Sequence, residues 1–500
     1  MKSFSVAFGQ FTNLSLRGAE GDVAIPVNPD YAEMPGLLRF ARNDHQCIKQ
    51  RSHSNQNWAR VLLLIMVVFT ITPCRSIWAW TEHPLVIHET LAALPEVRDA
   101  KPVKVESLDA FLMAEEKGLV TLLENEEAWA RQNLAWYKPL PEGLEFTATG
   151  NANDIRQRFC HAIRINPHTR FGLYLQFVPG ADAGGRPSIT PDRLTFLKDI
   201  SEWKSTTFAE LKEGEMVSPL DIVTTASDEP DFGLDIGLYE DDGTDFGKIY
   251  GFGKQPFGNP NLEYSSQGPF HMGYYHEAWI INAFADFVKQ TYPEYRIHLY
   301  KSLSEYAFRT GHNYWGWRFM GIGLHYVMDL NLPYHTTLLP GVSTLEMLWI
   351  NTLDMIGNSG PMNNAIQLVS NRHTAIEKFQ HMAMQEAYRQ KNIDYPVFIA
   401  LRSVKACPAW NDRTPRDVIS VKSNALADKA DKVMEETMPQ RWVCDPTFEL
   451  GTSPEQDDIL AIMKRNDGNK GIDKNTDLLK EMLEPLPGYI CSYVRSILAR

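Results

Sequence analysis

The chain has 500 residues, of which 44% are hydrophobic and 22% charged, a composition typical of a globular protein with a large core. It carries 49 Lys and Arg against 62 Asp and Glu, and the resulting net charge of −13 disfavours tight nucleic-acid binding through a basic surface patch. The length allows one large domain or about two or three smaller ones.

An apolar run at residues 61–72 lies near the N-terminus and ends at Pro73. The run is too short for a transmembrane helix, which needs about 20 residues, but it matches the hydrophobic centre of a secretory signal. We therefore expect residues 1–79 to be a leader that is removed after Ala79. The mature chain then begins at Trp80 and is secreted or periplasmic. With roughly 60 residues ahead of the apolar run, this leader exceeds the usual length of about 15–30 residues.

Export would fit the cysteine content of the mature chain. Removal of the leader leaves Cys160, Cys407, Cys444 and Cys491. These four allow two disulfides in any of three connectivities, or they are buried thiols, and the sequence does not choose between these arrangements.

The mature chain is predicted to be mainly helical as far as the middle of the sequence. His83 stands just before a helix whose first position is Pro84. Residues 226–271 are rich in Gly, Asp and aromatic residues, which predicts irregular loop structure of a length that is usually functional. The remaining elements expected here are two helices over 106–136, a strand or short buried helix over 171–178, and a helix over 188–213.

The second half of the chain shows amphipathic helical patterns and few strand signals, so we expect an all-α fold. Thr452-Ser-Pro-Glu marks a further helix start in the tail. The helices are expected over 275–289, 293–309, 312–328, 343–355, 364–388, 472–483 and 487–499.

The segment 324–335 carries the most informative spacing. His325 and Asp329 are four residues apart, so on a helix their side chains lie on one face, a turn apart. Pro333 interrupts the helix and can bring His335 back toward that pair. His373 and Glu377 form a second pair with the same spacing. Two imidazoles and a carboxylate that converge in apolar surroundings can bind zinc or a similar ion. The alternative is a structural His–Asp hydrogen bond followed by a surface histidine.

The order of these residues resembles the zinc-dependent phospholipases C and the related single-strand-specific fungal nucleases. Members of that family begin with a Trp that ligates zinc, followed by a His, an Asp, a His, a His-x3-Asp-x5-His segment and a closing His-x3-Asp or His-x3-Glu. The matching residues are Trp80, His83, Asp228, His271, His325, Asp329, His335, His373 and Glu377.

The resemblance implies an all-α catalytic domain over 80–400 with three zinc ions, followed by a helical C-terminal extension over 401–500 that packs on it. One zinc ion is expected on Asp228, His271, His325 and Asp329; a second on His335, His373 and Glu377; and a third on Trp80 and His83, with Asp329 bridging. Asp228 is also the expected catalytic residue that orients the attacking water. Alternatives that stay open are Trp78 for the terminus, His88 for His83, and Asp231 or His276 for the ligands near Asp228 and His271.

Clustered zinc ions suit hydrolysis of a phosphodiester because they neutralise its charge and lower the pKa of a bound water to about 7. Glu377 at the closing position resembles the phospholipase branch, which implies a phospholipase C acting on phospholipid at a membrane surface, with no stable nucleic-acid partner. Candidates to bind a choline-like headgroup are Glu82, Phe270 and Tyr274, with Tyr264 beside them. The alternatives are a nuclease of the same family that releases 5′-nucleotides, and a zinc-stabilised helical binding protein without catalysis.

Overall fold

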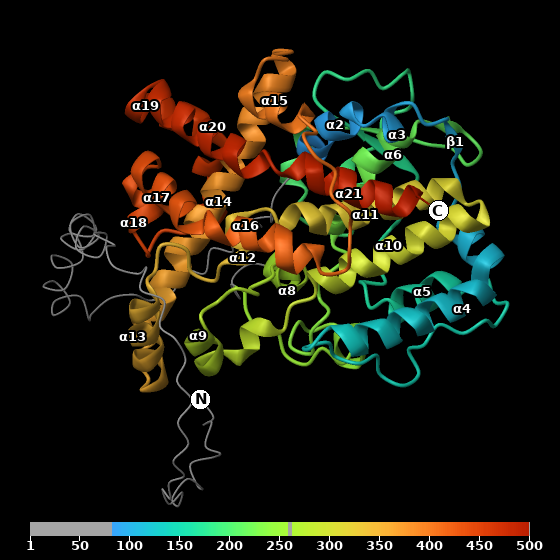
Figure 1. Ribbon diagram of the computed structural model, residues 1–500, viewed down its shortest axis with the longest axis horizontal. Coiled ribbons are helices and arrows are strands. Elements are labelled where there is room, and N and C mark those ends of the chain that lie inside the picture. The colour runs from blue at the N-terminus through green and yellow to red at the C-terminus, as the bar shows by residue number, and fades with distance from the viewer. Residues whose placement is uncertain (1–82, 259–262, 500) are drawn as a thin grey trace, which may run out of the picture. The chain divides into compact units, whose positions relative to one another are not determined.

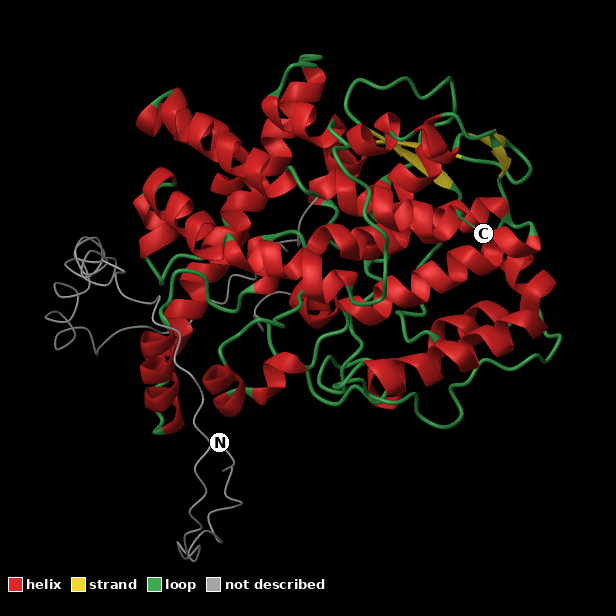
Figure 2. Cartoon of the chain, viewed as in Figure 1, coloured by secondary structure: helices red, strands yellow, loops and turns green. Residues whose placement is uncertain are grey.

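The computed structural model describes residues 83–258 and 263–499, and most of these residues are helical (Figure 1, Figure 2). Strands in the described part form two small antiparallel sheets, β1 (Val103–Lys104) with β4 (Met216–Val217) and β2 (Tyr174–Phe177) with β3 (Thr207–Glu210). The predicted all-α class is therefore confirmed. The predicted leader over 1–79, which includes Trp78, lies outside the described residues, and so do Trp80 and Glu82.

The helices of the first half of the chain lie before, within and just after the loop-rich region at residues 226–271. They are α2 (His83–Ala93), α3 (Pro95–Arg98), α4 (Leu108–Asn133), α5 (Ile155–Ala162), α6 (Pro219–Ala226), α7 (Asp245–Ile249), α8 (Gly268–His271) and α9 (Trp279–Phe284). Single turns lie between them at η3 (Pro191–Arg193), η4 (Ser201–Ser205), η5 (Glu229–Phe232), η6 (Glu263–Gln267) and η7 (Asp286–Lys289).

The second half holds most of the longer helices. They are α10 (Pro293–Thr310), α11 (Asn313–Asp329), α12 (Pro333–Thr336), α13 (Thr344–Met355), α14 (Gly360–Arg389) and α15 (Pro396–Arg402). The tail continues with α16 (Ser420–Ala425), α17 (Ala427–Thr437), α18 (Gln440–Cys444), α19 (Ile459–Asp467), α20 (Asn469–Leu483) and α21 (Leu486–Leu498). Its short turns are η8 (Pro415–Ile419), η9 (Leu450–Thr452) and η10 (Pro454–Asp458).

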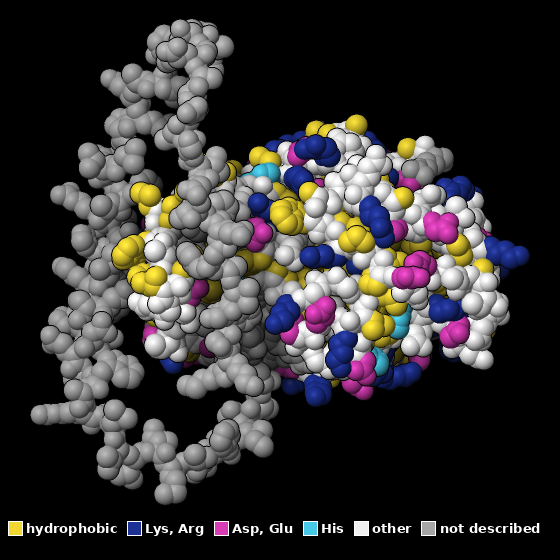
Figure 3. All heavy atoms as spheres, turned by 90° about the horizontal axis from the view of Figure 1, so that it is seen from below, with side chains coloured by type: hydrophobic (Ala, Val, Ile, Leu, Met, Phe, Trp, Pro, Cys, Tyr) yellow, Lys and Arg dark blue, Asp and Glu magenta, His cyan; other side chains and the backbone are white. Residues whose placement is uncertain are grey.

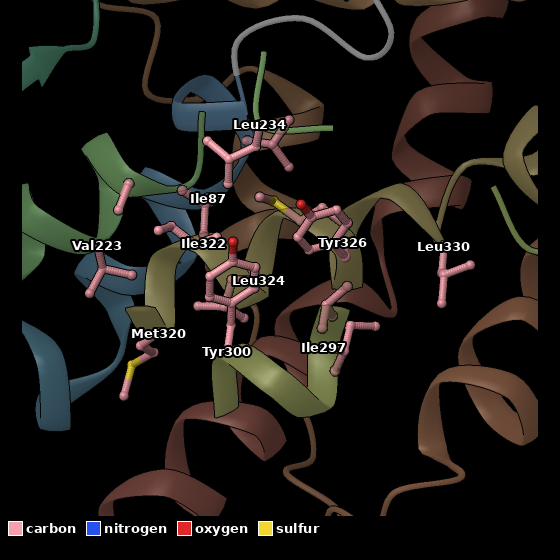
Figure 4. Close-up of a cluster of buried hydrophobic side chains, with 14 of the residues drawn as sticks. Ile87, Val223, Leu234, Ile297, Tyr300, Met320, Ile322, Leu324, Tyr326 and Leu330 are labelled. Carbon is pink, nitrogen blue, oxygen red and sulfur yellow. The ribbon is translucent and has the colours of Figure 1, made fainter. Parts of the chain in front are cut away.

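Helix α11 is the centre of the main core. Every residue from Tyr314 to Asp329 is buried, which fits a helix that is apolar on nearly all sides. Figure 4 shows Leu324 of α11 among side chains from three other helices, with Ile87 from α2, Val223 from α6 and Tyr300 from α10. The metal-ligand pair predicted on α11 is therefore held by packing on several sides.

A glycine allows α6 to approach α11 closely. A Cβ atom at Gly321 would lie 2.6 Å from the carbonyl oxygen of Val223 and 2.7 Å from the Cβ of Ala226. Because these atoms belong to a packed helix, a side chain at this position would push the two helices apart. Because α6 and α11 lie this close together, the end of α6 and the acidic turn η5 that follows it lie directly against α11.

The tail after residue 400 packs on the helices before it. Helix α21 lies along α10 and α11 (Figure 1), and its buried side chains belong to the same apolar core. Cys407 is joined to Cys491 by a disulfide, Cys444 is disulfide-bonded as well, and Cys160 is a buried free thiol, so the four cysteines that follow the predicted leader do not pair with one another into two disulfides. None of the described helices is long and apolar enough to cross a membrane.

Several predicted elements differ from the observed ones. The stretch 106–136 is one helix, α4, which begins after the N-cap Ser107. The predicted helix over 188–213 is wrong, since that stretch forms only η3, η4 and β3. Phe208 in β3 is buried in a second apolar cluster that contains Tyr174 of β2, so pairing with a distant strand outweighs the local helix signal.

The remaining elements agree well with prediction. Residues 171–178 contain the strand β2, one of the two structures expected there. The helices expected at 293–309, 312–328, 343–355 and 364–388 correspond to α10, α11, α13 and α14, and those at 472–483 and 487–499 correspond to α20 and α21. The helix expected over 275–289 is reduced to α9 and the turn η7.

Candidate metal centre

Histidine and carboxylate side chains from six elements converge beside the end of α11. Helices α11 and α14 each supply a pair one turn apart, as the spacing of four residues requires. The turn after α11 ends at Pro333, which starts α12 and returns the chain toward the pair on α11. The converging residues are His83 of α2, Asp231 of η5, His271 of α8, His325 and Asp329 of α11, His335 of α12, and His373 and Glu377 of α14.

Asp329 lies at the middle of this set and is fully buried. Its Oδ1 lies 3.4 Å from Nε2 of His83 and 3.4 Å from Nδ1 of His335. Its Oδ2 lies 2.9 Å from Nδ1 of His271 and 3.2 Å from Nε2 of His325. Neither oxygen accepts a well-aligned hydrogen bond from any residue that the structure describes, which is unusual for a buried carboxylate. One carboxylate thus faces four imidazoles, as expected for a ligand shared between cations.

The converging residues form three groups that could each hold a metal ion, and His325 belongs to two of them. In every group the ligand atoms lie within 4.8 Å of one another. Imidazole nitrogens mixed with carboxylate oxygens suit zinc and neighbouring transition metals better than magnesium or calcium. The groups are His83, Asp231 and His325; His271, His325 and Asp329; and His335, His373 and Glu377.

A second layer of contacts orients these side chains. Nδ1 of His325 lies 2.8 Å from the carbonyl oxygen of Ser227, so a proton on Nδ1 leaves a lone pair on Nε2, which lies 3.0 Å from Nδ1 of His271 and 3.2 Å from Oδ2 of Asp329. Nε2 of His271 lies 3.5 Å from Oδ2 of Asp235. Such outer contacts fix the ring orientation and raise the basicity of a metal-binding imidazole.

The imidazoles and carboxylates of this buried centre shift one another's pKa values. Burial alone would lower the pKa of His271, but nearby carboxylates, chiefly Asp329, raise it to about 10. Burial would raise the pKa of Glu377, but His373 and His335 lower it to about 2. The pKa of Asp329 is held well below its ordinary value by the imidazoles that face it. The carboxylates of Asp329 and Glu377 are therefore ionised and require cations close by, either protons on the imidazoles or metal ions.

Asp228 and Asp231 have different surroundings. Oδ1 of Asp228 accepts a hydrogen bond from the backbone N–H of His83 at 3.1 Å, and Oδ2 accepts one from Gln176 at 2.8 Å. Asp231 lies closer to the imidazoles, with Oδ2 at 3.3 Å from Nδ1 of His83 and Oδ1 at 3.8 Å from Nε2 of His325. The geometry favours Asp231 as the metal ligand and gives Asp228 a role in holding the start of α2.

His276 and His88 lie apart from the centre. Nε2 of His276 is 3.0 Å from the carbonyl oxygen of Arg416 and 2.9 Å from the hydroxyl of Ser420. His88 is partly exposed and pairs with Glu89 at 3.7 Å. Both histidines are thus engaged elsewhere, and His83 and His271 are the ones that converge.

A cavity of about 360 Å³ adjoins the third group of ligands, with His373 and Glu377 in its wall. Tyr274 and Tyr264, two of the predicted substrate-binding candidates, line this cavity. Phe270 does not line it, because its fully buried ring packs among other aromatic side chains. The prediction that Phe270 binds substrate is therefore replaced by a packing role. Most of the wall is apolar and includes Phe257, Met272, Val288, Leu339, Met347 and Val369.

Sequence reasoning did not identify Asp235 as part of the site. This fully buried residue accepts hydrogen bonds from Arg296 at 2.7 Å and from the hydroxyl of Tyr326 at 2.6 Å. Asp228, Asp231 and Asp235 recur at intervals of three and four residues, which is the signal that could have indicated one acidic face.

No family model, curated protein or solved structure matches this chain. Its function is therefore inferred from the buried centre and from the cavity that adjoins it. The residues named for the centre and the cavity lie within the described ranges 83–258 and 263–499.

Proposed function

We propose that this chain is a secreted zinc-dependent phosphodiesterase of the phospholipase C type. It would hydrolyse the glycerol-side phosphodiester of a phospholipid and release diacylglycerol and a phosphorylated headgroup. The observation that carries the proposal is the carboxylate of Asp329, buried among four imidazoles at 2.9–3.4 Å without an aligned hydrogen-bond donor among the described residues. A disulfide between Cys407 and Cys491 is compatible with export.

The donor set fits zinc. Five imidazoles and three carboxylates meet in a buried site, and atoms such as Nε2 of His373 and Oδ2 of Asp231 have no hydrogen-bond partner in the described part of the chain. Unpartnered buried polar atoms are costly unless a ligand engages them, so metal coordination accounts for them. The family resemblance implies three ions, and Asp329 would be shared between them.

Zinc, when bound, supplies Lewis acidity that stabilises charge on the phosphoryl oxygens and lowers the pKa of water. Asp231 offers an unpartnered oxygen that can accept a hydrogen bond from the attacking water. Asp228 is less suited to that task, since both of its oxygens already accept hydrogen bonds from His83 and Gln176. The proposed water-orienting residue is therefore Asp231, with Asp228 as its neighbour in the same turn.

The cavity favours a lipid over a nucleic acid. Apolar side chains make up most of its wall, which suits acyl chains, whereas single-stranded nucleic acid is usually bound in basic grooves. Tyr264, Tyr274 and Glu377 share that wall and could face a cationic headgroup. The net charge of −13 also disfavours a polyanionic substrate.

One assay set tests the proposal. Purified protein is incubated with phosphatidylcholine in detergent micelles and, separately, with single-stranded DNA, each with and without a zinc chelator. Release of diacylglycerol that the chelator abolishes is the expected result. Cleavage of DNA without lipid turnover would assign the centre to a nuclease instead. Stoichiometric zinc with neither activity would indicate a zinc-stabilised binding protein.

A further inference from the structure

An apolar surface surrounds the outer end of the cavity. The most exposed large hydrophobic side chains of the described residues are Leu345 at 80%, Trp279 at 79%, Ile356 at 76% and Met355 at 73%. Trp349 adds to them at 62%. We refer to these five residues, from α9, α13 and the residue after α13, as the α9–α13 rim. Their concentration in neighbouring elements is unlike the scattered hydrophobic residues of an ordinary surface.

Helix α13 carries apolar side chains both on the face that is buried and on the face that is exposed to solvent. Met347 and Ile350 are buried with Ile281 of α9 in one small apolar cluster. Leu345 and Trp349 are four residues apart and therefore share a different face, which points to solvent. An exposed apolar face beside a buried one is suited to contact with an apolar partner. Figure 3 shows hydrophobic side chains gathered at the left of the molecule, where α13 lies in Figure 1.

The rim is continuous with the cavity. Phe287, Met347 and Ile366 line the cavity and belong to the same corner of the molecule as α9 and α13. Phe287 and Ile366 are 43% and 42% exposed, so the cavity opens here, while buried Glu377 lies in its wall beside the metal centre. An apolar path therefore leads from the exposed rim to the proposed site of hydrolysis.

Charge on the rim argues for an electrically neutral surface as the partner. The elements α9, η7 and α13 carry Asp286, Lys289, Glu346 and Asp354, three acids against one base. Surfaces that bind anionic membranes carry clusters of Lys and Arg, which these elements lack. Exposed tryptophans beside aliphatic side chains are typical of segments that sit at the headgroup level of a bilayer.

We propose that the α9–α13 rim is a docking surface for a zwitterionic phospholipid bilayer. Trp279 and Trp349 lie at the headgroup level, Leu345 and Ile356 reach toward the acyl region, and the cavity mouth faces the lipid. A substrate molecule then enters the cavity without crossing water. The role of the rim in catalysis rests on the proposed phospholipase function, but the docking itself requires neither zinc nor turnover.

Sedimentation with phosphatidylcholine vesicles tests the docking surface without any activity measurement. The double variant Leu345→Ser and Trp349→Ser should lower the vesicle partition coefficient at least about tenfold, because each side chain loses apolar burial. The matched control is Ile393→Ser with Ile399→Ser, which removes two exposed hydrophobic residues near α15 and should leave partition unchanged. Adding phosphatidylserine to the vesicles should not strengthen binding of the original protein.

A second measurement separates the rim from the catalytic proposal. The rim variant should lose activity on vesicles at least about tenfold while it keeps activity on a short-chain phosphatidylcholine that is monomeric in solution. Equal vesicle binding by the rim variant and the original protein would overturn the docking surface, whether or not the protein is a phospholipase. A concentration-dependent dimer that the rim variant abolishes, with no vesicle binding, would also overturn it and assign the rim to a second copy of the chain.

Discussion

His335 faces Asp329 across the turn that begins after α11, with Nδ1 of the imidazole 3.4 Å from Oδ1 of the carboxylate. They are six positions apart in the sequence, a spacing that would leave them on different faces of a continuous helix. Pro333 begins the short helix α12 and so redirects the chain. Nε2 of His335 also lies 3.6 Å from Oε1 of Glu377, so His335 joins the candidate ligands of α11 to those of α14 in one centre.

Replacement of Asp329 by Asn should remove metal from the centre. The substitution keeps the volume but removes the negative charge that faces four imidazoles, so we expect metal content to fall and phosphodiesterase activity to drop by more than about 100-fold. Metal analysis of the purified variant, together with the activity assay, measures both. Asp192→Asn on exposed η3 is the control and should change neither quantity. Full metal content in the Asp329 variant would contradict the shared-ligand role.

Gly321→Ala should destabilise the protein by forcing α6 away from α11. The new Cβ would lie 2.6 Å from the carbonyl oxygen of Val223, which cannot rotate away as a side chain can. We expect a loss of about 1–3 kcal/mol in the free energy of unfolding, measured by urea denaturation. Gly360→Ala at the start of α14 meets no atom closer than 3.7 Å and should cause no loss. Equal stability of the two variants would mean that α6 and α11 are not tightly packed here.

Arg296→Met should destabilise the protein, because it breaks the buried ion pair between Arg296 and Asp235 beside the centre. The guanidinium donates to Oδ1 of Asp235 at 2.7 Å and to the backbone carbonyls of Ile163 and Arg164. Its removal leaves a buried carboxylate without its cation, so we expect a loss of about 3–5 kcal/mol in unfolding free energy. Arg193→Met, which breaks an exposed pair with Glu210, should leave the denaturation midpoint unchanged. A small effect at Arg296 would show that Asp235 is not ionised.

The two candidate metal-binding pairs were predictable from sequence because each depends on one turn of one helix. His325 with Asp329, and His373 with Glu377, require only that the local segment be helical. The choice between Asp228 and Asp231 depends instead on how the turn after α6 meets α2, and a lone sequence carries no signal for that contact. Asp235 was missed because its partners, Arg296 and Tyr326, are more than sixty residues away.

The fold was predictable to a similar degree. Long amphipathic segments such as 293–309 and 312–328 form helices because their own apolar pattern determines the buried face. The helix predicted over 188–213 failed because Phe208 and its neighbours pair with β2, a partner thirty residues earlier in the chain. Local propensity is a weak guide wherever such distant pairing competes with it.

Cys160 should be almost unreactive in the folded protein. Complete burial raises the pKa of its thiol to about 12, so at pH 8 the reactive thiolate is present at a fraction of roughly 10⁻⁴. Labelling with iodoacetamide at pH 8, followed by mass spectrometry of the peptide that contains Cys160, should detect modification only after unfolding in denaturant. In the unfolded chain the thiol pKa returns to about 8.5, which restores reactivity. Rapid labelling of the folded protein would contradict the burial of this part of the core.

Removal of metal should lower the thermal stability of the protein. The ionised carboxylates of Asp329 and Glu377 lie buried close to imidazoles that zinc would otherwise engage, so the metal-free centre loses ligand bonds that the unfolded chain cannot replace. We expect a chelator to lower Tm by about 5 °C or more, since a ligand present at 1,000 times its Kd contributes about 4 kcal/mol. Zinc should restore the original Tm, whereas magnesium and calcium should not, because the donor set is rich in imidazole nitrogen. A Tm that the chelator leaves unchanged, or that magnesium restores equally well, would exclude a zinc centre built on Asp329.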